Sequence, residues 1–189
     1  MNNEKTFERG NALKVIVGYP FGVLLISVLL NIFVFGVDPF IAALPVKPVF
    51  VAASLAAVML AVNHSVLMTT TELVRARYGL HATPEEWAAS DDNPESVSSY
   101  GIQELARNHN THRNATENTV IFAVIAPLFL LSSPPLLAAV FWFLGFGIGR
   151  LGHTYGFLKG RDGIRGLFMT VNLLSLYGMA SYLLFSFFV

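Results

Sequence analysis

Five apolar stretches, separated by short polar or proline-containing segments, dominate the pattern of this chain of 189 residues. A membrane-spanning helix needs roughly 20 predominantly apolar residues, and each stretch reaches that length, the third only together with a polar helical extension before it. The pattern therefore predicts an all-α membrane protein in which every span is a helix. The predicted spans cover residues 15–37, 49–73, 118–131, 136–157 and 164–188.

The third span differs from the others because only its second half is apolar. A helix over residues 101–131 would measure about 46 Å, against an apolar bilayer core of about 30 Å. Its first half carries Arg107, Asn110, Asn114 and Glu117, whose spacings of three and four place them on one helical face. Ionisable side chains at membrane depth are costly and commonly mark a functional site. We therefore expect a polar ligand to bind along this stripe.

A second polar set lies on the fourth span, where Arg150, His153 and Phe157 share one helical face with Thr154. On the third span, Arg113 precedes Glu117 by four residues, so the two side chains are able to pair along the helix. One such ion pair could simply hold two helices together. Two polar sets on separate spans favour a binding site instead.

Basic residues cluster on one side of the predicted spans, and the opposite side has only Lys47. They flank the first span, the long polar loop before the third span, and the loop before the last span: Lys5, Arg9, Lys14, Arg75, Arg77, Arg107, Lys159, Arg161 and Arg165. The positive-inside rule then puts the amino terminus and both loops in the cytoplasm, and the carboxyl terminus outside. Gly160 is expected to end the fourth helix, and Asp162 to cap the fifth.

The first span has a second interpretation as a cleaved signal peptide, because a basic segment precedes it. Its apolar run is long for that role, and no A-x-A cleavage site follows. We therefore expect a retained span.

Composition narrows the chemistry further. Hydrophobic residues make up 54% and charged residues 13%, and the 12 basic and 12 acidic residues cancel, so nothing favours a nucleic-acid partner. The chain has no cysteine, which excludes disulfides, thiolate metal sites and a cysteine nucleophile. His109 and His112 form only half of a metal-binding pattern, so we expect no metal site and disfavour a di-metal oxygenase.

Two motifs carry a resemblance to a known family. They are R-x-x-x-x-H-R-N-x-x-E from Arg107 to Glu117 and R-x-x-H-T-x-x-F-L over residues 150–158, and V-R-A-R at 74–77 accompanies them. Together they resemble the signatures of the MAPEG superfamily, the membrane-associated proteins in eicosanoid and glutathione metabolism. The resemblance covers about residues 47–188 and is greatest to the prostaglandin E synthase and glutathione transferase branches.

The resemblance implies a four-helix transmembrane bundle over residues 46–189, with 1–45 as one extra amino-terminal transmembrane segment. It also implies a homotrimer that binds glutathione between neighbouring subunits near the cytoplasmic face. The implied glutathione-binding residues are Arg75, Arg113, Asn114, Glu117, Arg150, His153, Phe157 and Arg165, of which Arg165 is the catalytic one. The chemistry agrees, because arginine binds carboxylates bidentately and Glu117 could hold the glutathione ammonium.

The chain departs from the family pattern at three positions. Phe157 stands where both branches have tyrosine, and Gly166 and Met169 stand where the prostaglandin synthase has serine and tyrosine. These changes weaken the interpretation as a specific prostaglandin isomerase and leave a general glutathione transferase intact.

The sequence thus predicts a membrane enzyme that transfers glutathione to lipophilic electrophiles through an arginine-stabilised thiolate, with peroxidase or isomerase chemistry as variants. Its expected partners are glutathione, a lipophilic small molecule, the lipid bilayer and two further copies of the chain. We expect a membrane of the bacterial inner or endoplasmic-reticulum type. The alternative is a non-catalytic lipid-binding or partner-binding membrane protein. A transporter is disfavoured, because the outer halves of the spans carry almost no polar residues.

Overall fold

The computed structural model describes the backbone of residues 2–189 and the side-chain environments of residues 12–189, and in this part the chain is helical without strands. Five helices are long and apolar enough to cross a membrane, which confirms the all-α membrane class. The elements in chain order are α1 (Asn2–Leu30), η1 (Asn31–Phe35), α2 (Lys47–Tyr78), α3 (Pro84–Ala89), η2 (Pro94–Ser96), α4 (Ser99–Leu131), α5 (Leu136–Leu158) and α6 (Asp162–Ser186).

Helix α4 runs unbroken through 33 residues, so its polar first half is helical as the sequence predicts. At 1.5 Å per residue it is about 50 Å long, which exceeds the apolar core of a bilayer. Ser98 caps its start by accepting a hydrogen bond from the Gly101 backbone N–H at 3.1 Å. The polar first half of α4 therefore extends from the bundle interior beyond one of its ends.

The expectation for Asp162 is wrong. Asp162 is the first residue of α6, and Arg161 occupies the cap position without a side-chain hydrogen bond. The carboxylate of Asp162 instead lies 3.3 Å from the guanidinium of Arg165, one turn along the same helix. Gly160 does take the left-handed conformation just after α5, with φ of 62°.

Helix α5 is the centre of the bundle and packs against α2, α4 and α6. Its aromatic residues form the core with Phe129 of α4 and Tyr182 of α6. Because lipid is as apolar as these side chains, close helix contact depends on shape and small residues rather than on escape from water. Gly156 shows this most clearly, since a Cβ there would lie 2.6 Å from the backbone nitrogen of Arg165.

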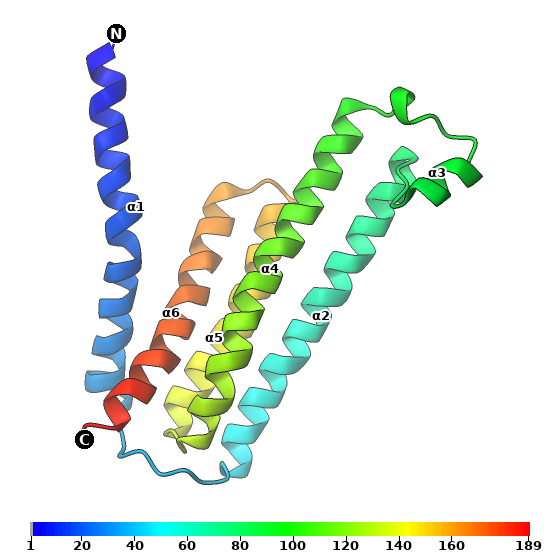
Figure 1. Cartoon of the computed structure of the whole chain (residues 1–189). Coiled ribbons are helices and arrows are strands. Elements are labelled where there is room, and N and C mark those ends of the chain that lie inside the picture. Colours follow the sequence, from blue (N-terminus) through cyan, green and yellow to red (C-terminus); the bar gives the residue numbers. More distant parts are fainter. Residues whose placement is uncertain (1) are drawn as a thin grey trace.

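Helix α1 packs against α6. The turn of η1, which continues α1 directly, contacts both α5 and α6. Asn31 is fully buried, donates to the Gly178 carbonyl at 2.8 Å, and accepts a hydrogen bond of 3.0 Å from the indole nitrogen of Trp142. One turn before Asn31, the Ser27 hydroxyl donates to the Leu174 carbonyl at 3.0 Å, and nearer the amino terminus Tyr19 and Thr170 share a hydrogen bond of 2.7 Å. Figure 1 shows α1 separating from α6 toward the amino terminus. Helix α1 is thus held at one end.

Candidate functional site

The predicted site residues all lie in one half of the bundle, toward the end where α2 and α5 finish and α4 and α6 begin (Figure 1). We call this end the basic end, because it carries the basic residues Arg75, Arg77, Arg107, Lys159, Arg161 and Arg165. The long connection through α3 lies at the same end. The helices therefore bring residues from four separate parts of the chain toward one membrane face.

Arg150 is the most deeply buried charged residue of the site. It is 0% exposed, and its Nη2 donates to the Asn114 side-chain oxygen of α4 at 3.1 Å. Among the side chains that the structure describes, no carboxylate lies within 4 Å of this guanidinium, and its Nε and Nη1 have no hydrogen-bond partner. Buried donors are normally satisfied, so these N–H groups are suited to an anion or an ordered water.

A second group joins α5 to the start of α6. The Arg165 guanidinium lies 5.1 Å from the centroid of the Phe157 ring, and the His153 ring lies 5.8 Å from that of Phe157. A cation over an aromatic face is held by the ring quadrupole. Arg165 remains 43% exposed and meets only the exposed carboxylate of Asp162, so its charge is available to a ligand. The close approach at Gly156 is what brings Arg165 to this ring.

The polar stripe on α4 does not share one environment, which corrects the sequence prediction. Asn114 is half-buried against α5, whereas Asn110, Arg113 and Glu117 are exposed. The expected pair between Arg113 and Glu117 does not form within 4 Å, as judged from the described side chains. A single chain thus leaves both charges on the outer surface of a membrane helix, where a ligand or a neighbouring subunit must compensate them.

Arg75 lies apart from these groups, in the last turn of α2. Its Nη1 pairs with Glu72 at 2.6 Å, and its Nε is buried without a partner. Arg75 lines a hollow of about 480 Å³, together with Glu86 and His81 from the connection between α2 and α4. The structure therefore joins Asn114 to Arg150 and His153 to Phe157 and Arg165, but it leaves Arg113 and Glu117 exposed and places the partly buried Arg75 beside a separate hollow.

One buried polar contact escaped the sequence analysis. Asn172 of α6 is fully buried and donates to the side-chain oxygen of Asn118 at 3.0 Å. Asn118 follows Asn114 by one helical turn, so the two asparagines link α4 to α6 and α5 in succession. The four-residue spacing of Asn114 and Asn118 indicated that both lie on one face of α4. It could not indicate which helix each one contacts, because that depends on the packing of the bundle.

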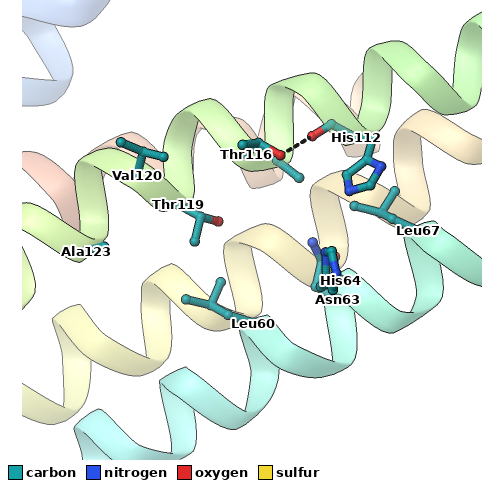
Figure 2. A pocket seen from close by; sticks show the side chains of 10 residues that line it. Leu60, Asn63, His64, Leu67, His112, Thr116, Thr119, Val120 and Ala123 are labelled. Atoms are coloured by element: carbon teal, nitrogen blue, oxygen red, sulfur yellow. Dashed lines mark hydrogen bonds between the residues drawn. The ribbon is translucent and has the colours of Figure 1, made fainter.

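A pocket of about 330 Å³ lies between α2 and α4, beside the polar stripe. Figure 2 shows His112 of α4 directed toward His64 of α2, and their ring centroids lie 5.5 Å apart. The rest of the lining is mostly aliphatic, including Leu60 and Leu67. A second hollow of about 340 Å³ shares Leu60, Thr119 and Ala123 with the pocket and extends it along both helices. The two form a largely apolar groove along α2 and α4, with His112 and His64 in its lining.

The groove offers two imidazoles without an acidic partner. Within the described residues, no group of three or more histidine, cysteine, aspartate or glutamate side chains is placed to hold a metal ion. The polar atoms of this half of the bundle are mainly arginine and asparagine, which suit an anionic organic ligand better than a metal.

The family model described as MAPEG family matches residues 48–185. The match runs from the start of α2 to the end of α6 and leaves α1 and η1 outside it. It thus includes every predicted site residue. No individual curated protein matches the chain.

Proposed function

Because this chain belongs to the MAPEG family of integral membrane proteins in glutathione and eicosanoid metabolism, we propose that it transfers glutathione to lipophilic electrophiles within the bilayer. The family includes glutathione transferases and synthases, and some of its members are not enzymes. The observation that carries the proposal is Arg165, a half-exposed cation held over the ring of Phe157 at the start of α6, a ring that His153 of α5 also approaches.

The charges of the site complement those of glutathione. Glutathione carries two carboxylates, one ammonium and one thiol. The free N–H groups of Arg150 and the exposed guanidinium of Arg113 are suited to carboxylates, and Glu117 is suited to the ammonium. Arg75 would serve the second carboxylate, for which it must exchange its contact with Glu72.

The proposed chemistry starts from the thiol that the protein itself lacks. A free thiol has a pKa of about 8.5, and a neighbouring cation lowers it by stabilising the thiolate. Arg165 lies in the first turn of α6, where the helix dipole adds positive potential. The thiol proton passes to water, and the thiolate attacks the electrophilic carbon to form a sulfur–carbon bond. The electron pair of the bond that breaks either leaves with a leaving group or, for an activated double bond, moves onto the neighbouring carbon, which then takes a proton from water.

Two further features support this proposal. The apolar groove between α2 and α4 is lined by His112, the chain neighbour of Arg113, so a lipophilic substrate could reach this region from the bilayer. The exposed Arg113 and Glu117 would be costly toward lipid, which supports glutathione binding between the subunits of a homotrimer. With the basic end in the cytoplasm, glutathione would enter from that side.

The decisive experiment compares Arg165→Ala with Arg161→Ala, because both remove one cation from the same region of the chain. We expect Arg165→Ala to retain glutathione in calorimetry but to lose the ultraviolet absorbance of the thiolate and most conjugation of a model electrophile. Arg161, whose guanidinium lies 5.8 Å from the centroid of the Tyr155 ring, should be dispensable for both. Equal thiolate absorbance in the two variants would refute the role of Arg165.

The alternative, a non-catalytic member that binds lipid or a protein partner, makes a different prediction. Such a protein could bind glutathione without activating it, or fail to bind it at all. Calorimetry combined with a panel of electrophiles separates the two functions, because only the transferase shows both binding and turnover.

A further inference from the structure

The hydroxyl of Tyr19 connects α1 to the first half of α6, close to the proposed catalytic cation. The Tyr19 hydroxyl oxygen lies 2.7 Å from the hydroxyl oxygen of Thr170. Thr170 uses its single proton to donate to the Gly166 carbonyl at 3.0 Å, so the Tyr19 hydroxyl is the donor in this pair. Gly166 directly follows Arg165 in the chain. A helix that lies outside the family match therefore places a phenol beside the start of α6.

One side of α6 is left uncovered between its contacts with α5 and α1. Phe168 and Asn172 pack against glycines of α5, whereas Thr170 and Leu174 contact α1 through hydrogen bonds. With 3.6 residues per turn, the positions between these two sets, on the side that carries Arg165, form a strip in which each residue is at least partly exposed. A Cβ at Gly166 would meet no atom within 4 Å, so the strip is open there. This open strip consists of Arg165, Gly166, Met169 and Leu173.

The open strip contains few groups that could bind a polar atom of a substrate. Met169 and Leu173 have no side-chain donor, and the Thr170 proton is used on the Gly166 carbonyl. Tyr19 borders the strip and is 38% exposed, and its hydroxyl proton can rotate toward a second acceptor. Among the described residues along the strip, Arg165 and Tyr19 are therefore the side chains available to donate to a ligand.

The spacing of these two donors along α6 restricts the kind of electrophile. Arg165 and Thr170, which Tyr19 contacts, are five residues apart, or about 7.5 Å along the helix axis. When a thiolate held by Arg165 adds to a conjugated carbonyl compound, its sulfur ends four bonds from the carbonyl oxygen. Two donors at this spacing can contact the sulfur and that oxygen at once. A substrate that loses a halide presents no such oxygen, because its charge departs with the leaving group.

We propose that Tyr19 is a specificity-determining residue that binds the carbonyl oxygen of a lipophilic α,β-unsaturated aldehyde or ketone, an inference that rests on the proposed transferase function. The thiolate forms a bond to the β-carbon, and the electron pair of the carbon–carbon double bond moves to give an enolate. The Tyr19 hydroxyl turns from Thr170 to the enolate oxygen and stabilises its charge by a hydrogen bond. The α-carbon then takes a proton from water, and the phenol keeps its own.

The test compares conjugation of trans-2-nonenal with conjugation of benzyl chloride by the purified full-length protein in detergent. Tyr19→Phe removes only the phenolic oxygen. We expect kcat and kcat/KM for trans-2-nonenal to fall about 10- to 100-fold, the range for a lost hydrogen bond to a charged group that forms in the transition state. The rate with benzyl chloride should fall far less, and the thiolate absorbance of bound glutathione should persist.

Ser27→Ala is the matched control, because Ser27 also joins α1 to α6 by a hydrogen bond, to the Leu174 carbonyl at 3.0 Å, but further from Arg165. If Tyr19 only holds α1 in place, both variants should affect both electrophiles alike. The proposal is overturned if Tyr19→Phe leaves the rate with trans-2-nonenal intact, slows both electrophiles equally, or is matched by Ser27→Ala. Those outcomes leave the proposed function standing, whereas an unchanged protein that conjugates neither electrophile refutes both.

Discussion

Arg150 is the residue on which the interior of the site depends. It is a cation in a membrane protein with no carboxylate near it, and Asn114 supplies the only hydrogen bond to its guanidinium in the described structure. Breaking a contact to a buried charge is costly because the remaining charge keeps its full desolvation penalty. Asn114 is therefore a structural partner of Arg150 as well as a proposed ligand of glutathione.

Replacing Asn114 should reveal this dependence. We expect Asn114→Leu to lower the free energy of unfolding by about 1–3 kcal/mol, the range for a lost hydrogen bond to a charged group. Asn110→Leu is the control, because Asn110 lies one turn earlier on the exposed face. Denaturant unfolding in detergent measures both. Equal stability of the two variants would show that Arg150 finds another partner.

Glu117 allows a test of binding polarity. If Glu117 holds the glutathione ammonium, Glu117→Gln should weaken glutathione by a free energy of about 2–5 kcal/mol, as for one partner of a buried charge pair. Affinity for a hydrophobic electrophile should change far less. Titration calorimetry with each ligand gives the comparison, and unchanged glutathione affinity would contradict the assignment.

At the scale of elements, a close backbone contact between α5 and α6 positions Arg165, the proposed catalytic cation. Helices α5 and α6 meet at Gly156, and the backbone at the start of α6 leaves no room for a larger residue at this position. A Cβ at this point meets backbone, which cannot rotate away as a flexible side chain would. The position of Arg165 over Phe157 therefore depends on a glycine that lies outside the predicted set of ligand-binding residues.

The variant Gly156→Ala should displace the first turn of α6 and reduce turnover strongly while leaving the other helices in place. Gly163→Ala provides the control in α6, because a Cβ at Gly163 would meet no atom within 4 Å, so its turnover should not fall. Conjugation rate and helical circular dichroism are the readouts. Full activity of Gly156→Ala would mean that Arg165 tolerates the shift.

Helix α1 is held by polar contacts, among which the buried Asn31 just after the helix bonds both α6 and Trp142 of α5. Asn31→Leu would remove its hydrogen bonds and leave the Trp142 indole nitrogen without an acceptor. We expect α1 to become protease-sensitive at residues 36–46, while glutathione binding is retained because α1 contains no predicted site residue. Limited proteolysis with and without the change tests this, with Ser54→Leu on the exposed side of α2 as the control.

At the scale of the whole molecule, we expect the exposed charges of α4 to determine how copies of the chain assemble. Arg113 and Glu117 face outward from a bundle whose surface is largely covered by apolar side chains. We expect a symmetric trimer that encloses them, with a detergent-corrected mass three times the chain mass of 20.7 kDa. A fully active monomer by sedimentation or light scattering would contradict this.

The positions of the helices could be predicted from the sequence, but which side of each helix is buried could be predicted less well. Span positions follow from apolar length, and the unbroken α4 follows from its periodicity, so both could be predicted from the chain alone. The two sides of α4 could not, because its buried positions are set by contacts with α2, α5 and α6 at once. Asn114 therefore turned inward while Arg113 remained outside, and the partner of Asn118 appeared only in the packed structure.

The polar first half of α4 also has a consequence for how the protein enters a membrane. Helices are delivered to the bilayer in chain order, and a segment with several charges partitions poorly when it is alone. When α4 emerges, α2 is available, but α5 and α6, which supply the partners of Asn114 and Asn118, have not been synthesised. Integration of α4 should therefore stall at the interface until α5 and α6 follow. Chains truncated after residue 135 are expected to be removed by quality-control proteases, whereas chains truncated after residue 78 should insert stably.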